Sequence, residues 1–165
     1  MNVNLLEFLS MAAVSKWSIG FSSHNGDFIV VIPKTSPLPA RRSVTVTTAF
    51  DSQQDMKLSI WMGESGRAED NYPLSNIRLE GFQKENPAGV SRVKLTFYAY
   101  EHSVIKIGCC YKEGDPEQEI SIIPAADLSE ADMNRLRELV NDMTSRVTPR
   151  EIPGSDLGTV PLSPV

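Results

Sequence analysis

Apolar and polar residues alternate in short runs along most of residues 15–124, and turn residues separate the runs. The clearest runs lie between Phe28 and Phe82. There an apolar segment is followed by a Pro-rich connection and by two alternating segments rich in Val, Thr, Leu and Ile. A repeat of two with many β-branched residues is typical of strands that bury one face. The polar loop 51–55 between the two alternating segments has the length of a hairpin connection.

The same pattern predicts about eight strands. They are expected at Lys16–Phe21, Phe28–Ile32, Ser43–Phe50, Met56–Met62, Leu74–Leu79, Arg92–Tyr100, Val104–Cys109 and Gln118–Ile123. Asn25-Gly26, between the first two, is a strong hairpin signal. Pro33, Pro37 and Pro39 exclude a helix from the next connection, because proline cannot continue one.

After Pro124 the apolar residues recur every three or four positions, which predicts one amphipathic helix over 128–148. Ser129 is a candidate N-cap, with an acidic residue three positions later. Residues 149–165 hold four prolines and two glycines, and we predict that this tail is disordered. Residues 1–14 carry no strong strand or cap signal, and we expect an arm or linker there.

Composition and charge fit one globular domain with a single core, at 165 residues and 41% hydrophobic. The formal charge of −5 and the lack of a basic stripe argue against nucleic acid as the main partner. No apolar run approaches the roughly 20 residues that cross a membrane. Cys109 and Cys110 are adjacent, so on a strand they face opposite sides. We therefore expect reduced thiols and a cytoplasmic protein.

No group of residues predicts catalysis or metal binding. His24 and His102 do not stand at ligand spacing from the two cysteines, so we expect no metal. Glu64 and Asp70 fall in loops without a neighbouring nucleophile, which favours solvated charge over an acid–base pair. We therefore expect neither enzymatic activity nor a cofactor.

Several short segments occur in a fixed order along the chain: Ile32–Pro39, Arg41–Ser43, Thr47–Ala49, Gly63-Glu64, Asp70-Asn71, Leu79–Phe82, Val93–Phe97 and Leu128-Ser129. In this order they resemble the peptide-binding half of the heat shock protein 70 (DnaK-type) chaperones. The likeness covers roughly Trp17–Val147. It implies a mainly β fold, an antiparallel β-sandwich over 15–124 followed by one C-terminal α-helix that begins the family's lid.

The resemblance also implies a channel for an extended peptide. Its lining would be Phe21, Val46, Met56, Leu58 and Val93, and His24 with Ala49 would form the arch over the bound peptide. Alternation alone leaves open that all seven residues pack in the sandwich core or in loops. His24 departs from the apolar residue that the family usually has in the arch.

Other departures bear on function. The 165 residues contain no Gly-rich phosphate loop, so we expect that the chain does not bind ATP. Phe8–Val14 replaces the family's acidic, leucine-rich linker, and no helical bundle follows the predicted helix. We expect chaperone-type binding of extended apolar segments of unfolded polypeptides, and an ATPase domain or co-chaperone acting in trans is a further candidate partner. The alternative is an interaction module that keeps the sandwich without the channel. Whether the chain is a natural short protein or a fragment stays open.

Overall fold

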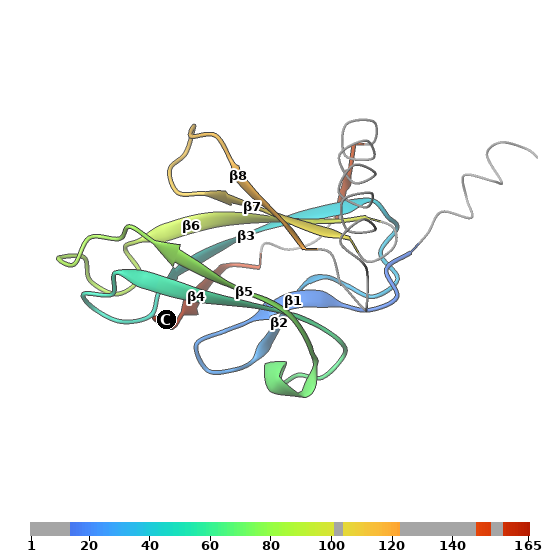
Figure 1. The fold of residues 1–165 in the computed structure, drawn as a ribbon, viewed down its shortest axis with the longest axis horizontal. Coiled ribbons are helices and arrows are strands. Elements are labelled where there is room, and N and C mark those ends of the chain that lie inside the picture. The colour runs from blue at the N-terminus through green and yellow to red at the C-terminus, as the bar shows by residue number, and fades with distance from the viewer. Residues whose placement is uncertain (1–13, 101–103, 123–147, 153–156) are drawn as a thin grey trace, which may run out of the picture.

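The computed structural model describes residues 14–100, 104–122, 148–152 and 157–165, which form two β-sheets facing each other (Figure 1). The four-stranded sheet has the order β2-β1-β4-β5, and the six-stranded sheet has the order β10-β3-β6-β7-β8, with β9 also paired to β3. The bounds are β1 Ile19–Ser22, β2 Phe28–Ile32, β3 Ala40–Thr48, β4 Asp55–Met62, β5 Tyr72–Glu80, β6 Arg92–Ala99, β7 Ile105–Cys110, β8 Gln118–Ile122, β9 Arg150–Glu151 and β10 Thr159–Leu162. A short 3-10 helix, η1, spans Ala68–Asp70. The prediction of a mainly β sandwich is confirmed.

Alternation along the strands places the core between the sheets. On β4, Met56, Leu58 and Ile60 are fully buried, while the intervening Lys57 is exposed on the outer face. The same repeat of two buries one side of β3 and of β6, as expected for strands with a single apolar face. Phe21 of β1 stacks on Phe97 of β6 with ring centroids 6.0 Å apart, so one aromatic pair joins the two sheets.

The observed strand limits differ most from the predicted ones at β3, which spans Ala40–Thr48 rather than Ser43–Phe50, and at the start of β1, which begins at Ile19 rather than Lys16. Backbone groups before Ile19 are bonded to loops and side chains instead of a neighbouring strand. The N–H of Ser15 donates to the carbonyl of Ser36 at 2.9 Å, and the carbonyl of Ser18 accepts from the N–H of Gly63 at 3.0 Å. The N–H of Ser18 donates to Oε1 of Glu64 at 2.7 Å, and the ammonium of Lys34 lies 5.6 Å from the ring centre of the half-exposed Trp17. Residues 15–18 are therefore held in place without being part of a strand.

Both cysteines are free and lie on opposite faces of β7, as the sequence predicts. Cys109 faces the core and is 2% exposed, whereas Cys110 is partly exposed. Burial, with a smaller contribution from the Glu117 carboxylate, raises the pKa of the Cys109 thiol to about 11. Cys109 is therefore a protonated packing residue at neutral pH.

The prediction that residues 149–165 are disordered is wrong for the part of the tail that the structure describes. β9 pairs in parallel with the start of β3, and β10 pairs in parallel with its end. The prediction failed because the tail's average composition is polar and Pro-rich, although Thr159–Leu162 itself alternates polar and apolar residues. Pro161 fits because β10 is an edge strand, where a missing amide hydrogen costs little. Most of the predicted helix 128–148 and of the arm 1–14 lies outside the described residues.

Candidate peptide channel

The five residues predicted to line a channel all lie in one buried apolar cluster between the sheets. They come from four strands and are fully buried: Phe21 on β1, Val46 on β3, Met56 and Leu58 on β4, and Val93 on β6. Val46 and Val93 are direct partners across the β3–β6 pair. The strands therefore bring together residues that are up to 72 positions apart in sequence, from Phe21 to Val93.

The C-terminal strand β10 lies against this cluster. Val160 is in register with Val46, and Leu162 with Thr48. Val160 is 8% exposed and Leu162 is fully buried, and both belong to the same apolar cluster as the five predicted residues. Figure 1 shows the red C-terminal ribbon between the two layers near β4. An extended segment of the chain itself thus packs in the same cluster as the predicted lining and pairs directly beside Val46.

Hydrogen bonds hold β10 from both sides. On the side away from β3, the N–H of His24 donates to the carbonyl of Pro161 at 3.1 Å, and the N–H of Lys57 donates to that of Ser163 at 2.8 Å. On the β3 side, Nε2 of Gln53 donates to the carbonyl of Leu162 at 2.9 Å. β10 therefore bridges the two sheets, with the loops 23–27 and 49–54 beside it.

Gln53 is a functional candidate that the sequence did not predict. Its side chain is buried, and its Oε1 accepts from the N–H groups of Ala49 and Phe50 at 2.9 and 3.1 Å. Its Nε2 donates to the carbonyl of Asp55 at 2.7 Å as well as to that of Leu162. One amide thus shapes the loop after β3 and contacts the extended segment. No local signal distinguishes Gln53 from the exposed Gln54 beside it.

The two residues predicted to form the arch lie in the loops that flank β10. His24 is exposed, and its ring meets the ring of Phe50 edge-on with centroids 6.4 Å apart. Ala49 is half-buried and precedes Phe50. The aromatic contact therefore joins the loop after β1 to the loop after β3.

The family model described as Hsp70 protein matches residues 5–150, which is most of the chain. The chain belongs to the Hsp70 family. It is similar to a protein named Chaperone protein dnaK1 from Prochlorococcus marinus, with 28% identity over 137 residues, covering 83% of this chain and 20% of that protein. It is also similar to Chaperone protein DnaK from Mycoplasma mycoides, with 28% identity over 123 residues, covering 74% of this chain and 21% of that protein.

The chain spans about a fifth of the length of these curated Hsp70-family relatives. The match includes β1 to β8, all seven predicted site residues and Gln53, but it ends before β10. The segment that fills the candidate channel therefore lies outside the matched region.

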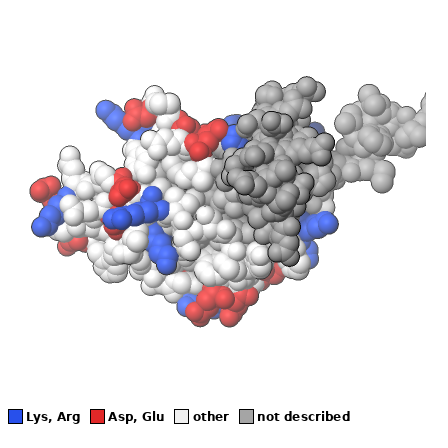
Figure 2. All heavy atoms as spheres, in the orientation of Figure 1, with Lys and Arg blue, Asp and Glu red and all other residues white. Residues whose placement is uncertain are grey.

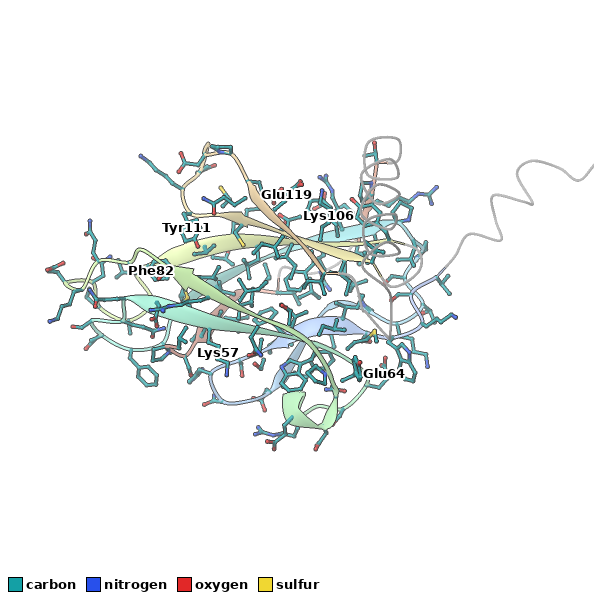
Figure 3. All side chains as sticks on the ribbon, viewed as in Figure 1. Lys57, Glu64, Phe82, Lys106, Tyr111 and Glu119 are labelled. Atoms are coloured by element: carbon teal, nitrogen blue, oxygen red, sulfur yellow. The ribbon has the colours of Figure 1, made fainter. Side chains whose placement is uncertain are left out.

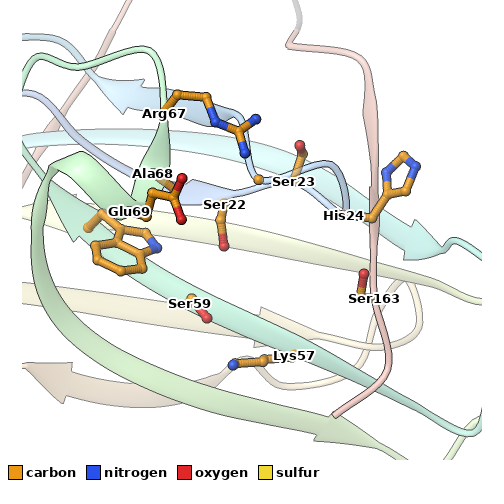
Figure 4. Close-up of a pocket in the computed structure, with 11 residues that line it drawn as sticks. Ser22, Ser23, His24, Lys57, Ser59, Arg67, Ala68, Glu69 and Ser163 are labelled. Atoms are coloured by element: carbon orange, nitrogen blue, oxygen red, sulfur yellow. The ribbon is translucent and has the colours of Figure 1, made fainter.

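A hollow of about 260 Å³ lies beside the candidate channel, on the outer face of the four-stranded sheet (Figure 4). Its lining includes Lys57 and Ser59 of β4, His24, and Arg67 of the loop that follows β4. Ser163 closes one end, next to His24. The hollow therefore lies where the chain continues past β10 at Ser163.

The loop beyond β4 that bounds this hollow is organised by Asn71. Its Nδ2 donates to the carbonyls of Ser65 and Arg67 at 3.0 and 2.9 Å, and its Oδ1 accepts from the N–H of Ser65 at 2.9 Å. Gly63 has a φ of +153°, and a Cβ there would lie 2.2 Å from Asn71 Oδ1. A glycine is therefore required for this close approach.

At one end of the sandwich, Phe82, just after β5, meets Tyr111, just after β7, with ring centroids 6.1 Å apart (Figure 3). Lys106 and Glu119 form an ion pair across β7 and β8. On the face in Figure 2, charged side chains of both signs are scattered among uncharged ones.

Other chemistry is not evident in the part of the chain that the structure describes. Its His, Cys, Asp and Glu side chains form no group that could hold a metal ion. Glu64 accepts hydrogen bonds from the backbone and the hydroxyl of Ser18, so it ties the start of β1 to the loop after β4. None of the described helices has the length and apolar character to span a membrane.

Proposed function

We propose that this Hsp70-family chain binds extended apolar segments of unfolded polypeptides, with the channel between β3, β4 and the loops 23–27 and 49–54 as the site. One observation carries the proposal. An extended segment, β10, already pairs with β3 beside Val46, is bonded through its backbone, and buries two apolar side chains in the same apolar cluster as the predicted lining. A foreign segment with the same features would find the same partners.

The proposed mode of binding follows from the hydrogen-bond donors that lie beside β10. His24, Lys57 and Gln53 present hydrogen-bond donors to carbonyl groups of the extended chain. Every residue has a carbonyl, so these bonds favour an extended backbone over any particular sequence. Full burial of one Leu-like side chain adds roughly 1.5–3 kcal/mol. The expected specificity is therefore broad, with an apolar residue at the centre.

The test is a fluorescence-anisotropy titration with a labelled, Leu-centred extended peptide and a matched peptide that carries Asp at the centre. We expect saturable binding of the Leu peptide and at least tenfold weaker binding of the Asp peptide, because a carboxylate loses the apolar contact and pays a desolvation cost. Equal binding of both peptides would favour the alternative, an interaction module without the channel. No binding, either by the chain or by a form that ends at Leu157, would refute the proposal.

A further inference from the structure

Residues 159–163 lie where the proposed function places a foreign peptide. We propose that this segment is the channel's built-in ligand, and that extended segments of other chains bind by displacing it. The inference rests on the proposed function, since it names the competitor at that same site. It also names the ligand class: an extended segment that runs parallel to β3, with apolar side chains at two positions separated by one residue.

The direction of β10 sets it apart from the rest of the sandwich. The pairs that join β1 to β8 in the described residues are all antiparallel. β9 and β10 instead run parallel to β3, along the edge of that strand opposite β6. β1 to β8 thus complete two sheets without the tail. The tail is added to an edge, as a bound peptide is in strand addition.

The side chains of the segment follow the pattern expected of a ligand. Val160 and Leu162 point into the apolar cluster, while Thr159, Pro161 and Ser163 are exposed or half-buried. Pro161 offers a carbonyl to His24 but has no amide hydrogen to offer. The protein therefore only donates to the segment at this position, through the N–H of His24, and the site accepts proline between two apolar residues.

The groups that hold the segment can serve any extended chain. Two are backbone N–H groups, of His24 and Lys57, and the third is the amide of Gln53. At the far end, the N–H of Val165 donates to Oδ1 of Asp55 at 2.9 Å, while Oδ2 of Asp55 pairs with Arg78 at 2.7 Å. Departure of the tail frees these groups for the backbone of an incoming peptide.

The covalent link gives the segment an advantage over free peptide. A tethered ligand has an effective concentration on the order of millimolar. A free peptide of similar intrinsic affinity must reach comparable concentrations to compete. The apparent affinity for foreign peptide is therefore expected to be at least about tenfold lower in the full chain than in a chain whose segment cannot bind.

The experiment compares the full chain with three variants in the same peptide titration. One ends at Leu157, one carries Leu162→Asp, and the matched control carries Thr159→Asp, which adds the same charge at an exposed position of the same strand. We expect the first two to bind the labelled peptide at least tenfold more tightly than the full chain. The control should bind like the full chain. A synthetic peptide of residues 158–165 should displace the label from the chain that ends at Leu157.

The outcomes separate the two proposals. If the shortened chain binds the labelled peptide with the affinity of the full chain, the built-in ligand is refuted and the proposed function stands. If no form binds peptide, the proposed function fails and the inference fails with it. Circular dichroism checks folding. If both the shortened chain and Leu162→Asp are unfolded, β10 is an integral strand and the inference is refuted.

Discussion

Gln53 has more bonding partners than any other side chain near the channel. Its amide makes four hydrogen bonds, two of them to N–H groups of the loop after β3 and one to β10. A buried amide placed in this way fixes a loop conformation that backbone bonding alone does not specify. The side chain therefore acts on both the fold and the binding edge.

Replacement of Gln53 by Ala should lower the free energy of unfolding by roughly 2 kcal/mol, because it leaves the Ala49 and Phe50 N–H groups without their acceptor. Urea unfolding followed by circular dichroism measures the change. Gln54→Ala is the matched control, since Gln54 is exposed, and it should stay within about 0.5 kcal/mol of the parent. Equal changes in the free energy of unfolding for the two variants would contradict the role of Gln53 in holding the loop after β3.

A substitution at Val46 tests whether this side chain lines an open channel or packs in a closed core. Val46→Asp should weaken peptide binding on the order of a hundredfold, because a carboxylate replaces the apolar contact. Once β10 leaves, that carboxylate can stay solvated in an open channel, so the melting temperature should change little. Peptide affinity and thermal unfolding are measured on the same sample.

Thr45→Asp is the control for Val46, because Thr45 is the next residue of β3 and is not part of the apolar cluster. It should bind peptide like the parent. An unfolded Val46→Asp protein would place Val46 in a closed core, where an unpaired charge costs several kcal/mol of the roughly 5–15 kcal/mol that stabilise a domain. Unchanged peptide binding would likewise exclude Val46 from the channel.

At the scale of elements, alternate residues of β10 point their backbone groups in opposite directions, toward β3 and away from it. The carbonyl of Pro161 faces His24, so the N–H and carbonyl of its neighbours Val160 and Leu162 face β3 and the loop after it. A proline is therefore compatible with position 161 and incompatible with position 160.

Val160→Pro should detach β10, because it removes an N–H that faces β3. Hydrogen exchange followed by mass spectrometry would show faster exchange at residues 157–165, together with tighter binding of foreign peptide. Pro161→Ala is the matched control and should leave exchange of the neighbouring amides unchanged, since position 161 faces away from β3. Slow exchange in Val160→Pro would contradict the strand assignment.

At the scale of the whole molecule, the buried thiol of Cys109 and the half-buried hydroxyl of Tyr98 should make stability fall at alkaline pH. Burial is the main cause that raises the pKa of Cys109 to about 11, and burial followed by the hydrogen bond to Glu117 raises that of Tyr98 to about 12. Both groups are neutral when protonated, and their pKa values in the unfolded chain are about 8.5 and 10. The unfolded chain therefore ionises first, and stability that is fully present below about pH 8.5 is lost as pH rises toward these folded values.

The melting temperature, measured from pH 8 to 11, should decline with pH. Cys109→Ala should flatten the lower part of this decline, because it removes the thiol that titrates there. Cys110→Ala is the control at the partly exposed neighbour and should keep the slope of the parent. A slope that is identical in all three proteins would show that Cys109 does not contribute.

ATP should neither stabilise the chain nor change its peptide affinity, because the sequence contains no Gly-rich phosphate loop. Thermal unfolding with and without Mg-ATP measures the first effect, and peptide titration with and without it measures the second. A nucleotide-dependent rise in melting temperature would contradict this prediction.

The sequence by itself determined the class of fold and most of β1 to β8. Their apolar residues alternate locally, and local alternation specifies which face of a strand is buried. The limits of β2 were predicted to the residue, and those of β6 to within one residue. The ordered motifs also predicted the family, which the family model confirms. For β1 to β8, the sequence thus decided most of the residues that form strands and which of their side chains enter the core.

Only the tertiary structure decided what lies against Val46 and its neighbours. Leu162 and Gln53 are 109 positions apart, and no local pattern marks them as partners. The tail is rich in proline and has few apolar residues, so its own composition favours disorder. It is ordered because β3 offers an unpaired edge and the core offers space for two side chains, and both exist only once β1 to β8 have folded.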